Sequence, residues 1–403
     1  MYHSPVAFTP PIPPEGYYSP QQFEAECAHV FADSWHLAGT IDQLEKPGDY
    51  ISLKIMDVPV VVRNFSGELI ALRNVCAHRH AQLVCTASGH SETLKCPYHG
   101  WEYGPDGLTR KIPAAKNFPQ FNRKQYCLDK FAVETCGQLV FVRLTSSGLS
   151  LRDWMGERFD MIAEWFNPER WSHAMTLNFE YPCNWKIPIE ASLESYHIPS
   201  VHSKTFAEDP GEPNSDHFFH ETGTSMQTVF EGGRFIDRLL VFWERIIFWM
   251  MGVRHTIGYQ HHHIFPNLLV SHTASLTIAQ VILPESTTTS RGIVIQVGRR
   301  PERTNAVALA ASWWWKTLST WLTKPILNED IGIYPAVQAG VHAAKRSGIL
   351  GRCEERLYAS QRYIQQRIHG VAHQSTMIDD IAKLPEEHRP ATNEVSLAHH
   401  ENV

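Results

Sequence analysis

The 403-residue sequence lacks the glycine-rich fingerprints that bind nucleotides: it has no G-x-G-x-x-G segment and no Walker loop. It also lacks the C-x₄-C-x₂-C run of plant-type ferredoxins. The chain therefore has no recognisable means of taking electrons from NAD(P)H by itself. Its net charge is −6 and it has no basic stripe, which argues against nucleic acid as a partner.

Long hydrophobic runs are also missing. The most apolar stretch, Leu239 to Val253, spans fifteen residues and contains Glu244 and Arg245, so it is too short and too charged to span a bilayer. We expect core, lid or subunit-interface packing for it, with a helix on a membrane surface as the alternative. The first residues, M-Y-H-S-P-V-A-F, have neither a basic region nor an apolar run, so no secretory signal is expected.

Cysteine is scarce, with eight residues in 403. Two of them stand beside histidines in the motifs described next, and the others show no paired spacing. Reduced thiols are the default for such a pattern, and a cytoplasmic location is expected. The six remaining positions are Cys27, Cys85, Cys127, Cys136, Cys183 and Cys353.

Two short motifs carry one cysteine and one histidine each. Cys76 and His78 stand in N-V-C-A-H-R-H, and Cys96 and His99 stand in K-C-P-Y-H-G-W after a gap of seventeen residues. Two thiolates and two imidazoles are the ligands of a Rieske [2Fe-2S] centre, in which two histidines replace cysteines on one iron. The same set could hold zinc, but zinc fingers usually place both cysteines in one motif. The mixed motifs therefore favour the Rieske cluster.

A second segment, N-W-K-I-P-I-E-A-S-L-E-S-Y-H-I-P-S-V-H, contains His197 and His202. Their offset of five does not match one face of a regular helix. Because the residue before a proline is biased away from the helical conformation, Pro199 predicts a helix end near His197, so that His202 can fold back toward the same point. Two imidazoles and one carboxylate form the facial triad of non-haem Fe(II) oxygenases. By themselves, however, two histidines in a chain with 23 are weak support.

Taken together, the two motifs and the pattern N-W-K…E-x-Y-H-x-x-x-x-H resemble the catalytic, alpha-type subunits of Rieske non-haem iron oxygenases, over roughly 35 to 345. Ala81 and Tyr98 stand where respiratory Rieske proteins carry an extra disulfide, so the motifs are of the oxygenase or ferredoxin type. One departure is His80, where the family usually has glycine; a side chain there must avoid positive φ. We expect His80 not to be a ligand, since the four-ligand set is complete without it.

The resemblance implies roles for further residues. In L-N-E-D-I-G-I-Y-P-A-V-Q, an acidic pair precedes a glutamine as in the family's ligand helix, which makes Asp330 the third iron ligand and Glu329 the alternative. Glu194 matches the family's acidic residue that hydrogen-bonds a histidine at the iron and a cluster histidine of the neighbouring subunit, as an electron bridge. Glutamate there is typical of relatives that oxidise choline, carnitine or betaine, whereas many aromatic-ring dioxygenases have aspartate.

The family further implies a Rieske [2Fe-2S] cluster, a mononuclear Fe(II), O₂ and a small-molecule substrate. Electrons would come from NAD(P)H through a separate reductase, with or without a ferredoxin, and the subunits would form a ring, most simply a homotrimer. We expect monooxygenation, by hydroxylation or oxidative demethylation, with cis-dihydroxylation of an aromatic ring as the alternative. A Rieske electron-transfer or zinc-binding protein without oxygenase activity is the rival from another class, but it leaves residues 184–202 and Asp330 unexplained.

The resemblance and the local texture divide the chain into four parts. Residues 1–40 are expected to form an N-terminal arm and helix, and 41–148, with short apolar runs broken by turns, a Rieske β domain. Residues 149–383 should form the mononuclear-iron domain, and 384–403 a polar tail. The predicted fold class is α+β, with a helix-grip-like catalytic domain of antiparallel sheet and helices.

Local signals sharpen this division. Ser19, Pro20 and Gln22 have the pattern of a capping box at a helix start. Near the end of the chain, the periodicity predicts two separate helices over 303–323 and 327–346.

Two further patterns predict strands. The run V-P-V-V-V-R-N turns through Phe65-Ser66-Gly67 into a second apolar run and reads as a hairpin. The triple His261-His262-His263 follows strand alternation, so at most the first and third share a face. We interpret these three histidines as structural.

Overall fold

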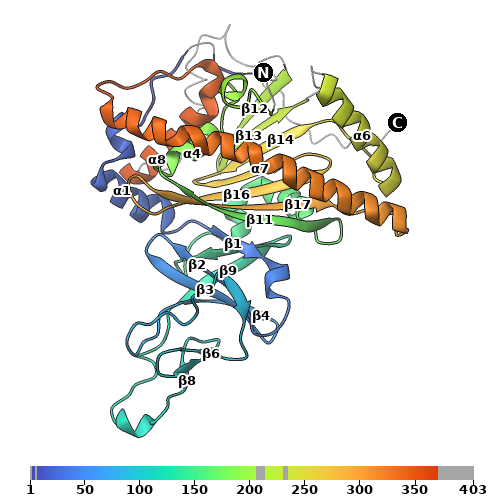
Figure 1. Ribbon diagram of the computed structural model, residues 1–403. Coiled ribbons are helices and arrows are strands. Elements are labelled where there is room, and N and C mark those ends of the chain that lie inside the picture. The colour runs from blue at the N-terminus through green and yellow to red at the C-terminus, as the bar shows by residue number, and fades with distance from the viewer. Residues whose placement is uncertain (1, 5–6, 206–213, 230–234, 371–403) are drawn as a thin grey trace.

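The computed structural model describes residues 2–4, 7–205, 214–229 and 235–370. It consists of a narrow β domain and a broader sheet covered by helices. In Figure 1 the β domain lies at the bottom and the helix-covered sheet at the top. The predicted α+β class and the order of the two domains are confirmed. In the described part of the chain, none of the helices has the length and apolar character that a membrane span requires. The tail predicted for 384–403 lies outside the described residues.

The strands of the N-terminal domain are β1 (His36–Thr40), β2 (Asp49–Ile55), β3 (Val58–Phe65), β4 (Glu68–Arg73), β5 (Ser88–His90), β6 (Leu94–Lys95), β7 (Glu102–Tyr103), β8 (Thr109–Lys111), β9 (Lys130–Cys136) and β10 (Leu139–Arg143). Seven of them form an antiparallel sheet in the order β1-β10-β9-β4-β3-β2-β5, and β6-β7-β8 form a smaller one. β1 precedes the boundary expected at residue 41, yet it pairs with β10 at one edge of the larger sheet.

The predicted hairpin joins β3 to β4. Phe65 pairs with Glu68, and the two residues between them, Ser66 (φ 57°) and Gly67 (φ 100°), both have positive φ. Such a two-residue turn matches the right-handed twist of the flanking strands. The register it sets places alternate side chains of β3 in the core of this domain, together with those of β2, β4 and β10.

The strands of the C-terminal domain are β11 (Trp171–Tyr181), β12 (Ser215–His220), β13 (Gly223–Thr228), β14 (Tyr259–Ile264), β15 (Leu268–His272), β16 (Leu276–Pro284) and β17 (Ser290–Arg299). They form one antiparallel sheet in the order β11-β17-β16-β15-β14-β13-β12. Neighbours in the sheet are therefore neighbours in the chain, except that the first strand, β11, returns to pair with the last, β17.

The helices are α1 (Pro20–Glu26), α2 (Leu151–Met155), α3 (Phe159–Trp165), α4 (Lys186–Ala191), α5 (Ile198–Val201), α6 (Phe235–Met251), α7 (Ala306–Ala343) and α8 (Glu355–His369). Short helical turns add η1 (Pro14–Tyr17), η2 (Cys27–Phe31), η3 (Ile41–Leu44), η4 (Ala115–Asn117), η5 (Gly156–Arg158) and η7 (Arg352–Glu354). In Figure 1, α7 crosses the sheet diagonally, and α8 and α4 lie on the same side of it.

The two faces of the C-terminal sheet are buried against different partners. One face packs on α2, α3 and the β1–β10 edge of the N-terminal sheet, in a shared core that includes Trp35, Phe141 and Val270. The other face packs under α4, α7 and α8, where Leu269 and Trp185 are buried. Because the first core contains side chains from both domains, hydrophobic burial holds the two domains together.

The long helix α7 is continuous where the sequence predicted two helices, over 303–323 and 327–346. The Asn305 side chain caps its start by accepting a hydrogen bond from a backbone amide (2.9 Å). Pro325 lies inside the helix and removes one backbone hydrogen bond. The carbonyl left without that bond belongs to Trp321, an exposed position that water can reach. The two-helix prediction was wrong because packing on the sheet outweighs the local cost of the proline.

The predicted cap of α1 is only half formed. Ser19 Oγ accepts a hydrogen bond from the Gln22 amide (3.3 Å), and Pro20 opens the helix. The Gln22 side chain, however, donates to Glu26 Oε1 (3.0 Å). Glu26 is fully buried, and this contact is one of several hydrogen bonds that its carboxylate accepts.

Candidate metal centres

The two cysteine–histidine motifs fold into matched turns. The amide of His80 donates to the Cys76 carbonyl (3.0 Å), and the amide of Gly100 donates to the Cys96 carbonyl (3.0 Å). The closing residue has positive φ in both turns, 60° at His80 and 72° at Gly100. The expectation that His80 avoids positive φ was wrong, because the turn itself requires this conformation and histidine is among the non-glycine residues that tolerate it.

The four predicted cluster ligands come together at these turns. Cys76 and Cys96 are buried, and the rings of His78 and His99 lie 4.6 Å apart. His78 stacks on Trp101, and its Nδ1 is buried without a hydrogen-bond partner among the described residues. A buried ring nitrogen with a free lone pair beside two thiols fits a [2Fe-2S] cluster, in which both would ligate iron. The side chain of His80, by contrast, is exposed.

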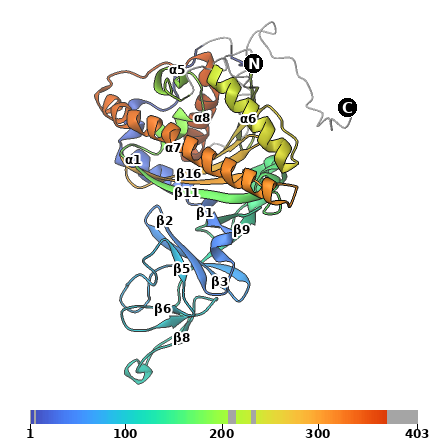
Figure 2. The ribbon, with the colours of Figure 1, turned by 45° about the vertical axis from the view of Figure 1, so that its right-hand side comes forward.

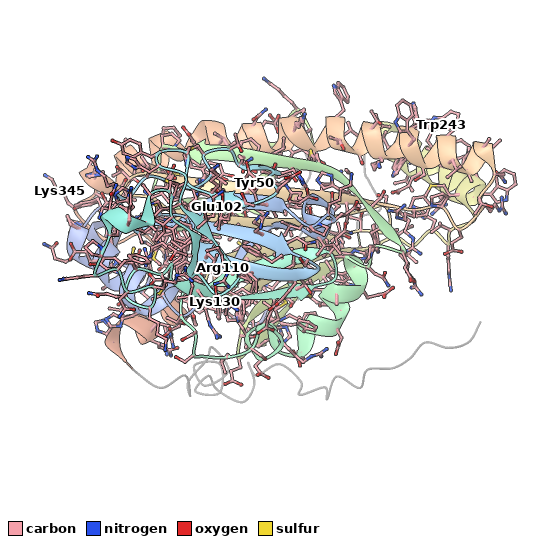
Figure 3. All side chains as sticks on the ribbon, turned by 90° about the horizontal axis from the view of Figure 1, so that it is seen from below. Tyr50, Glu102, Arg110, Lys130, Trp243 and Lys345 are labelled. Atoms are coloured by element: carbon pink, nitrogen blue, oxygen red, sulfur yellow. The ribbon has the colours of Figure 1, made fainter. Side chains whose placement is uncertain are left out.

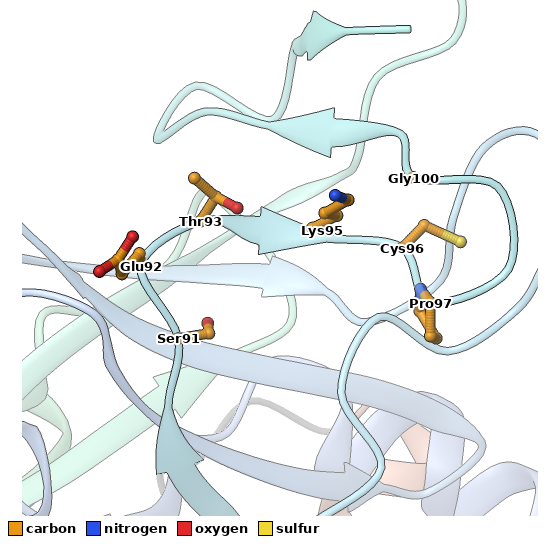
Figure 4. A pocket seen from close by; sticks show the side chains of 7 residues that line it. All are labelled: Ser91, Glu92, Thr93, Lys95, Cys96, Pro97 and Gly100. Carbon is orange, nitrogen blue, oxygen red and sulfur yellow. The ribbon is translucent and has the colours of Figure 1, made fainter. Parts of the chain in front are cut away.

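A shallow cavity of about 420 Å³ opens beside the second motif (Figure 4). The turn that carries Cys96 forms part of its lining. The second motif can therefore be approached from the surface. The lining residues are Ser91, Glu92, Thr93, Lys95, Cys96, Pro97 and Gly100.

The segment with the other two histidines folds differently from its prediction. α4 ends at Ala191 rather than near His197, and Pro199 opens α5 instead of ending a helix. His197 itself has helical dihedrals and precedes α5, while His202 follows it. A proline in the first turn of a helix costs no hydrogen bond, which is why α5 can begin there. The outcome for the two histidines is nevertheless as expected, since one short turn brings their rings together.

Three predicted iron ligands converge on one point. His197 Nε2 lies 3.3 Å from His202 Nε2, and Asp330 Oδ1 lies 3.0 Å from the second nitrogen and 3.5 Å from the first. Ligands at right angles, each roughly 2.1 Å from a metal, would be about 3.0 Å apart. Among the described residues, these three side chains are the set of acidic, histidine or cysteine residues whose ligand atoms lie close enough together to share one metal ion.

Two carboxylates fix the tautomers of these histidines. His197 Nδ1 donates to Glu194 Oε1 (2.6 Å), and His202 Nδ1 donates to Glu329 Oε2 (2.9 Å). With the proton on Nδ1 in both rings, both Nε2 atoms present lone pairs to each other and to Asp330. Three converging lone pairs repel one another unless a proton or a metal ion lies between them. The donor set therefore fits a divalent metal such as Fe(II).

The acidic pair of α7 divides two tasks between neighbouring residues. Asp330 faces both Nε2 atoms, whereas Glu329 faces the back of His202 and also accepts a hydrogen bond from the Thr205 hydroxyl (2.7 Å). Burial lowers the pKa of His202, but the hydrogen bonds to Asp330 and Glu329 outweigh it and leave that pKa raised. Sequence reasoning offered Glu329 only as an alternative ligand and missed this contact.

Glu194 holds its histidine twice. Besides the contact to Nδ1, Glu194 Oε2 accepts the backbone amide of His197 (3.0 Å). Glu194 lies between α4 and α5, three residues before His197. A carboxylate that binds both the ring and the amide leaves His197 little freedom to rotate.

The N-W-K triplet anchors this segment to distant helices. The Asn184 amide donates to Gln338 Oε1 on α7 (2.7 Å). Trp185 Nε1 and Lys186 Nζ donate to the two carboxylate oxygens of Glu26 on α1 (2.6 Å each). Lys186 and Glu26 form a fully buried ion pair. Sequence reasoning missed Glu26, although a charged residue on the apolar stripe of its helix was a usable signal.

The triple histidine on β14 is structural, in agreement with its interpretation. All three side chains are buried. His261 Nδ1 lies 2.7 Å from a guanidinium nitrogen of Arg356, His262 Nδ1 lies 2.7 Å from Ser225 Oγ, and His263 Nε2 contacts the Pro266 carbonyl (2.8 Å). Their hydrogen bonds go to the protein core and not to a shared metal point.

Comparison with known proteins assigns this arrangement to a family. A model of the ring hydroxylating alpha subunit (catalytic domain) matches residues 168–370, and a model of the Rieske [2Fe-2S] domain matches residues 34–122. The chain therefore belongs to the Rieske oxygenase alpha subunits, with a Rieske [2Fe-2S] domain followed by a ring-hydroxylating catalytic domain. The family predicted from the sequence is confirmed.

Several curated proteins resemble parts of this chain. It is 32% identical over 217 residues to chloroplastic choline monooxygenase of Beta vulgaris, which covers 50% of this chain and 48% of that protein. It is 29% identical over 226 residues to the glycine betaine monooxygenase oxygenase subunit of Pseudomonas aeruginosa (strain UCBPP-PA14), with coverages of 54% and 52%. Benzene 1,2-dioxygenase subunit alpha of Pseudomonas putida is 32% identical over 184 residues, with coverages of 44% and 41%. The chain spans about half the length of the curated relatives it matches.

Solved structures share the fold over most of the chain. A quaternary ammonium Rieske monooxygenase, whose structure addresses carnitine oxidation by gut microbiota and inter-subunit electron transfer, matches with a TM-score of 0.71 at 21% identity, covering 90% of this chain and 96% of that one. Naphthalene 1,2-dioxygenase with bound indole matches with a TM-score of 0.67 at 16% identity, with coverages of 91% and 96%. At these identities the likeness establishes the fold alone.

Proposed function

We propose that this chain is the oxygenase component of a multicomponent Rieske system that uses O₂ to monooxygenate a small organic substrate, by hydroxylation or oxidative demethylation. One observation carries this proposal: His197, His202 and Asp330 converge in the same chain as a Rieske motif pair. An electron-transfer protein needs only the cluster, and a zinc protein needs neither the triad nor its two orienting carboxylates.

In the proposed roles, Cys76, His78, Cys96 and His99 hold the cluster, and the triad holds a mononuclear Fe(II). When bound, the cluster would supply electrons one at a time and the iron would activate O₂ beside the substrate. The chain's own contribution is positional. Glu194 and Glu329 keep a proton on each Nδ1, which holds both Nε2 atoms in their ligating form.

The proposed assembly follows from the separation of the two centres. In Figures 1 and 2, β6 and β8 of the Rieske domain lie at the end of the molecule opposite α4 and α5, so one chain holds the two sites far apart. We propose a homotrimer in which each cluster passes electrons to the neighbour's iron, with Glu194 at the junction. The inter-subunit electron transfer described for the quaternary ammonium monooxygenase supports this arrangement.

The proposed electron supply is external and the proposed location cytoplasmic. The chain has no nucleotide fingerprint of its own, so a separate reductase, with or without a ferredoxin, would deliver electrons from NAD(P)H. The choline and glycine betaine monooxygenases among the relatives, together with Glu194, favour monooxygenation. The match to a benzene dioxygenase subunit is the specific observation that favours the second candidate, cis-dihydroxylation of an aromatic ring.

Oxidation of quaternary amines and aromatic acids under ¹⁸O₂ tests the proposal. The protein is reconstituted with a reductase and NADH, and products are analysed by mass. One ¹⁸O atom in a hydroxylated product, or one formaldehyde released with each demethylated product, supports monooxygenation, whereas two ¹⁸O atoms in a cis-diol support dihydroxylation. A colourless protein that binds stoichiometric zinc and oxidises nothing would overturn both candidates.

A further inference from the structure

The outer surface of α6 and α7 carries an unusual number of aromatic side chains. Six large aromatic residues there are 48–70% exposed, and they include every exposed tryptophan in the described part of the chain. Single exposed apolar side chains are normal, but a cluster of them on two packed helices is typical of a surface that binds a protein or a membrane. These residues are Phe242, Trp243, Trp249, Trp313, Trp314 and Trp321. We call the surface formed by them and by the cations described below the Trp–Arg face.

The first half of α7 buries one tryptophan, Trp315, in the small core that it shares with α6, but leaves its other tryptophans exposed. Its face toward the sheet carries small polar residues: Ser312 Oγ donates to the Arg299 carbonyl (3.0 Å), and Ser319 Oγ lies 3.2 Å from Gln296 Nε2. Trp314 and Trp321 follow these serines by two positions, about 200° around the helix, and so point away from the sheet. A helix that only covered a sheet would have its large apolar side chains on the inner face.

The neighbouring helix α6 extends the same surface. Ile247, Phe248 and Met251 pack with residues of α7 in a separate small core. On the opposite side, Phe242 and Trp249 are exposed and seven positions apart, which places them on one face. Figure 2 shows α6 beside α7 on the outer side of the sheet.

This surface lies away from the N-terminal domain. In Figure 3, Trp243 stands at the far edge beside α7, well separated from Glu102, Arg110 and Lys130 of the Rieske domain. A partner on the Trp–Arg face would therefore leave the cluster loops accessible.

The charge around these aromatic residues differs from that of the whole chain. Residues 235–254 and 299–324 contain eight lysines and arginines but three acidic residues, in a chain of net charge −6. Two of the acidic residues are engaged, Glu244 with His255 (2.9 Å) and Glu302 with Arg299 (3.3 Å). Six exposed cations make no ion pair with any described residue: Arg238, Arg245, Arg254, Arg300, Arg303 and Lys324.

We infer that the Trp–Arg face rests on the interfacial region of a lipid bilayer that contains anionic headgroups. Tryptophan is enriched at membrane–water interfaces, and lysine and arginine are attracted electrostatically to anionic lipids. An outward ridge of tryptophans flanked by cations has the character of helices that lie in the membrane plane. A second copy of the same face would bring these cations against one another, and like charges in contact repel. Binding is peripheral, since α6 and α7 stay packed on the sheet.

Vesicle co-sedimentation of the full-length protein tests this inference. The probes are vesicles of phosphatidylcholine alone and vesicles that also contain phosphatidylglycerol. We expect binding to the anionic vesicles, weakened by salt, and about fivefold weaker for each of Arg238→Gln and Arg245→Gln. Trp314→Ser combined with Trp321→Ser should abolish binding, whereas Leu149→Ser, an exposed apolar residue outside α6 and α7, should leave it unchanged.

Two results would overturn the inference. One is equal binding, or none, to both kinds of vesicle. The other is a fall in the solution mass of the Trp314→Ser/Trp321→Ser protein by sedimentation velocity, which would make the face a protein–protein interface. Circular dichroism and the cluster absorbance check that each variant is folded. If the tryptophan variant does not fold, the arginine variants, which change exposed side chains only, still decide the test.

Discussion

The two metal centres are built in opposite ways. The proposed cluster ligands lie on two matched turns that are close in the sequence, each closed by a hydrogen bond from the backbone amide four residues after its cysteine to the cysteine carbonyl. The mononuclear site joins one short turn, with His197 and His202, to a distant helix that brings Asp330. Local geometry therefore makes the first site, and tertiary packing of α7 makes the second. The two should respond differently to the same kind of mutation.

Removing a ligand should give the largest effect and should separate the two sites. Asp330→Ala is expected to reduce turnover to background and to lower iron by about one ion per subunit, because a facial triad cannot hold Fe(II) with two ligands. Its cluster absorbance and EPR signal should be unchanged. Cys96→Ala should instead lose the red-brown colour. Iron analysis with both spectra on one preparation makes the comparison.

Glu329→Ala is the control for this experiment. It should retain some mononuclear iron, since its carboxylate contacts the back of His202 and not the metal point. If Asp330→Ala stays active and Glu329→Ala loses both iron and turnover, the choice within the acidic pair is wrong.

Exchanging the two orienting carboxylates for amides should give an intermediate effect. Glu194→Gln and Glu329→Gln each weaken the hold on one imidazole, and the loss of such a partner typically costs 10–100-fold in metal affinity or activity. If Glu194 is also the bridge between subunits, only Glu194→Gln should slow reduction of the mononuclear site by a pre-reduced cluster in single turnover. Equal rates in the two variants would reduce Glu194 to an orienting residue.

The contrast also explains what could be foreseen from the sequence. The two cysteine–histidine turns and the Ser66-Gly67 turn are decided by local bonds, so their sequences alone indicate them. The continuity of α7 through Pro325 and the burial of Glu26 against Lys186 could not be predicted in this way, since both depend on contacts between segments far apart in the chain. For Asp330, resemblance to a family supplied what local pattern could not.

Acid should destabilise the catalytic domain more than the Rieske domain. Burial lowers the pKa of His262 and His263 to about 3 and that of His272 to about 4. The unfolded chain then binds more protons than the folded one between about pH 4 and 6.5, so stability falls as the pH falls through this window, by roughly 1.4 kcal/mol per pH unit for each histidine. Burial raises the pKa of Glu190 and that of Glu355 to about 7, and these two groups oppose the trend set by the histidines.

Thermal unfolding of the full-length protein between pH 7 and 5 measures this effect. The unfolding temperature should drop steadily as the pH is lowered. In His262→Asn the free energy of unfolding should depend less on pH, because unfolding then takes up about one proton fewer. A stability that is constant or rises toward pH 5 would contradict the prediction, since it would mean that the buried histidines take up protons without cost.

The smallest expected effect tests how closely the two turns match. His80→Gly removes a side chain at φ 60° and should stabilise the domain by about 0.5 kcal/mol, because relief of left-handed strain slightly exceeds the added freedom of glycine in the unfolded chain. Gly100→Ala is the reciprocal change. Its Cβ would meet Lys95 Cε and Pro113 Cγ at 3.3 Å in addition to the positive φ, so it should destabilise by about 1 kcal/mol. The midpoint of thermal cluster bleaching measures both. Loss of the cluster in His80→Gly would show that the exposed imidazole does more than close the turn.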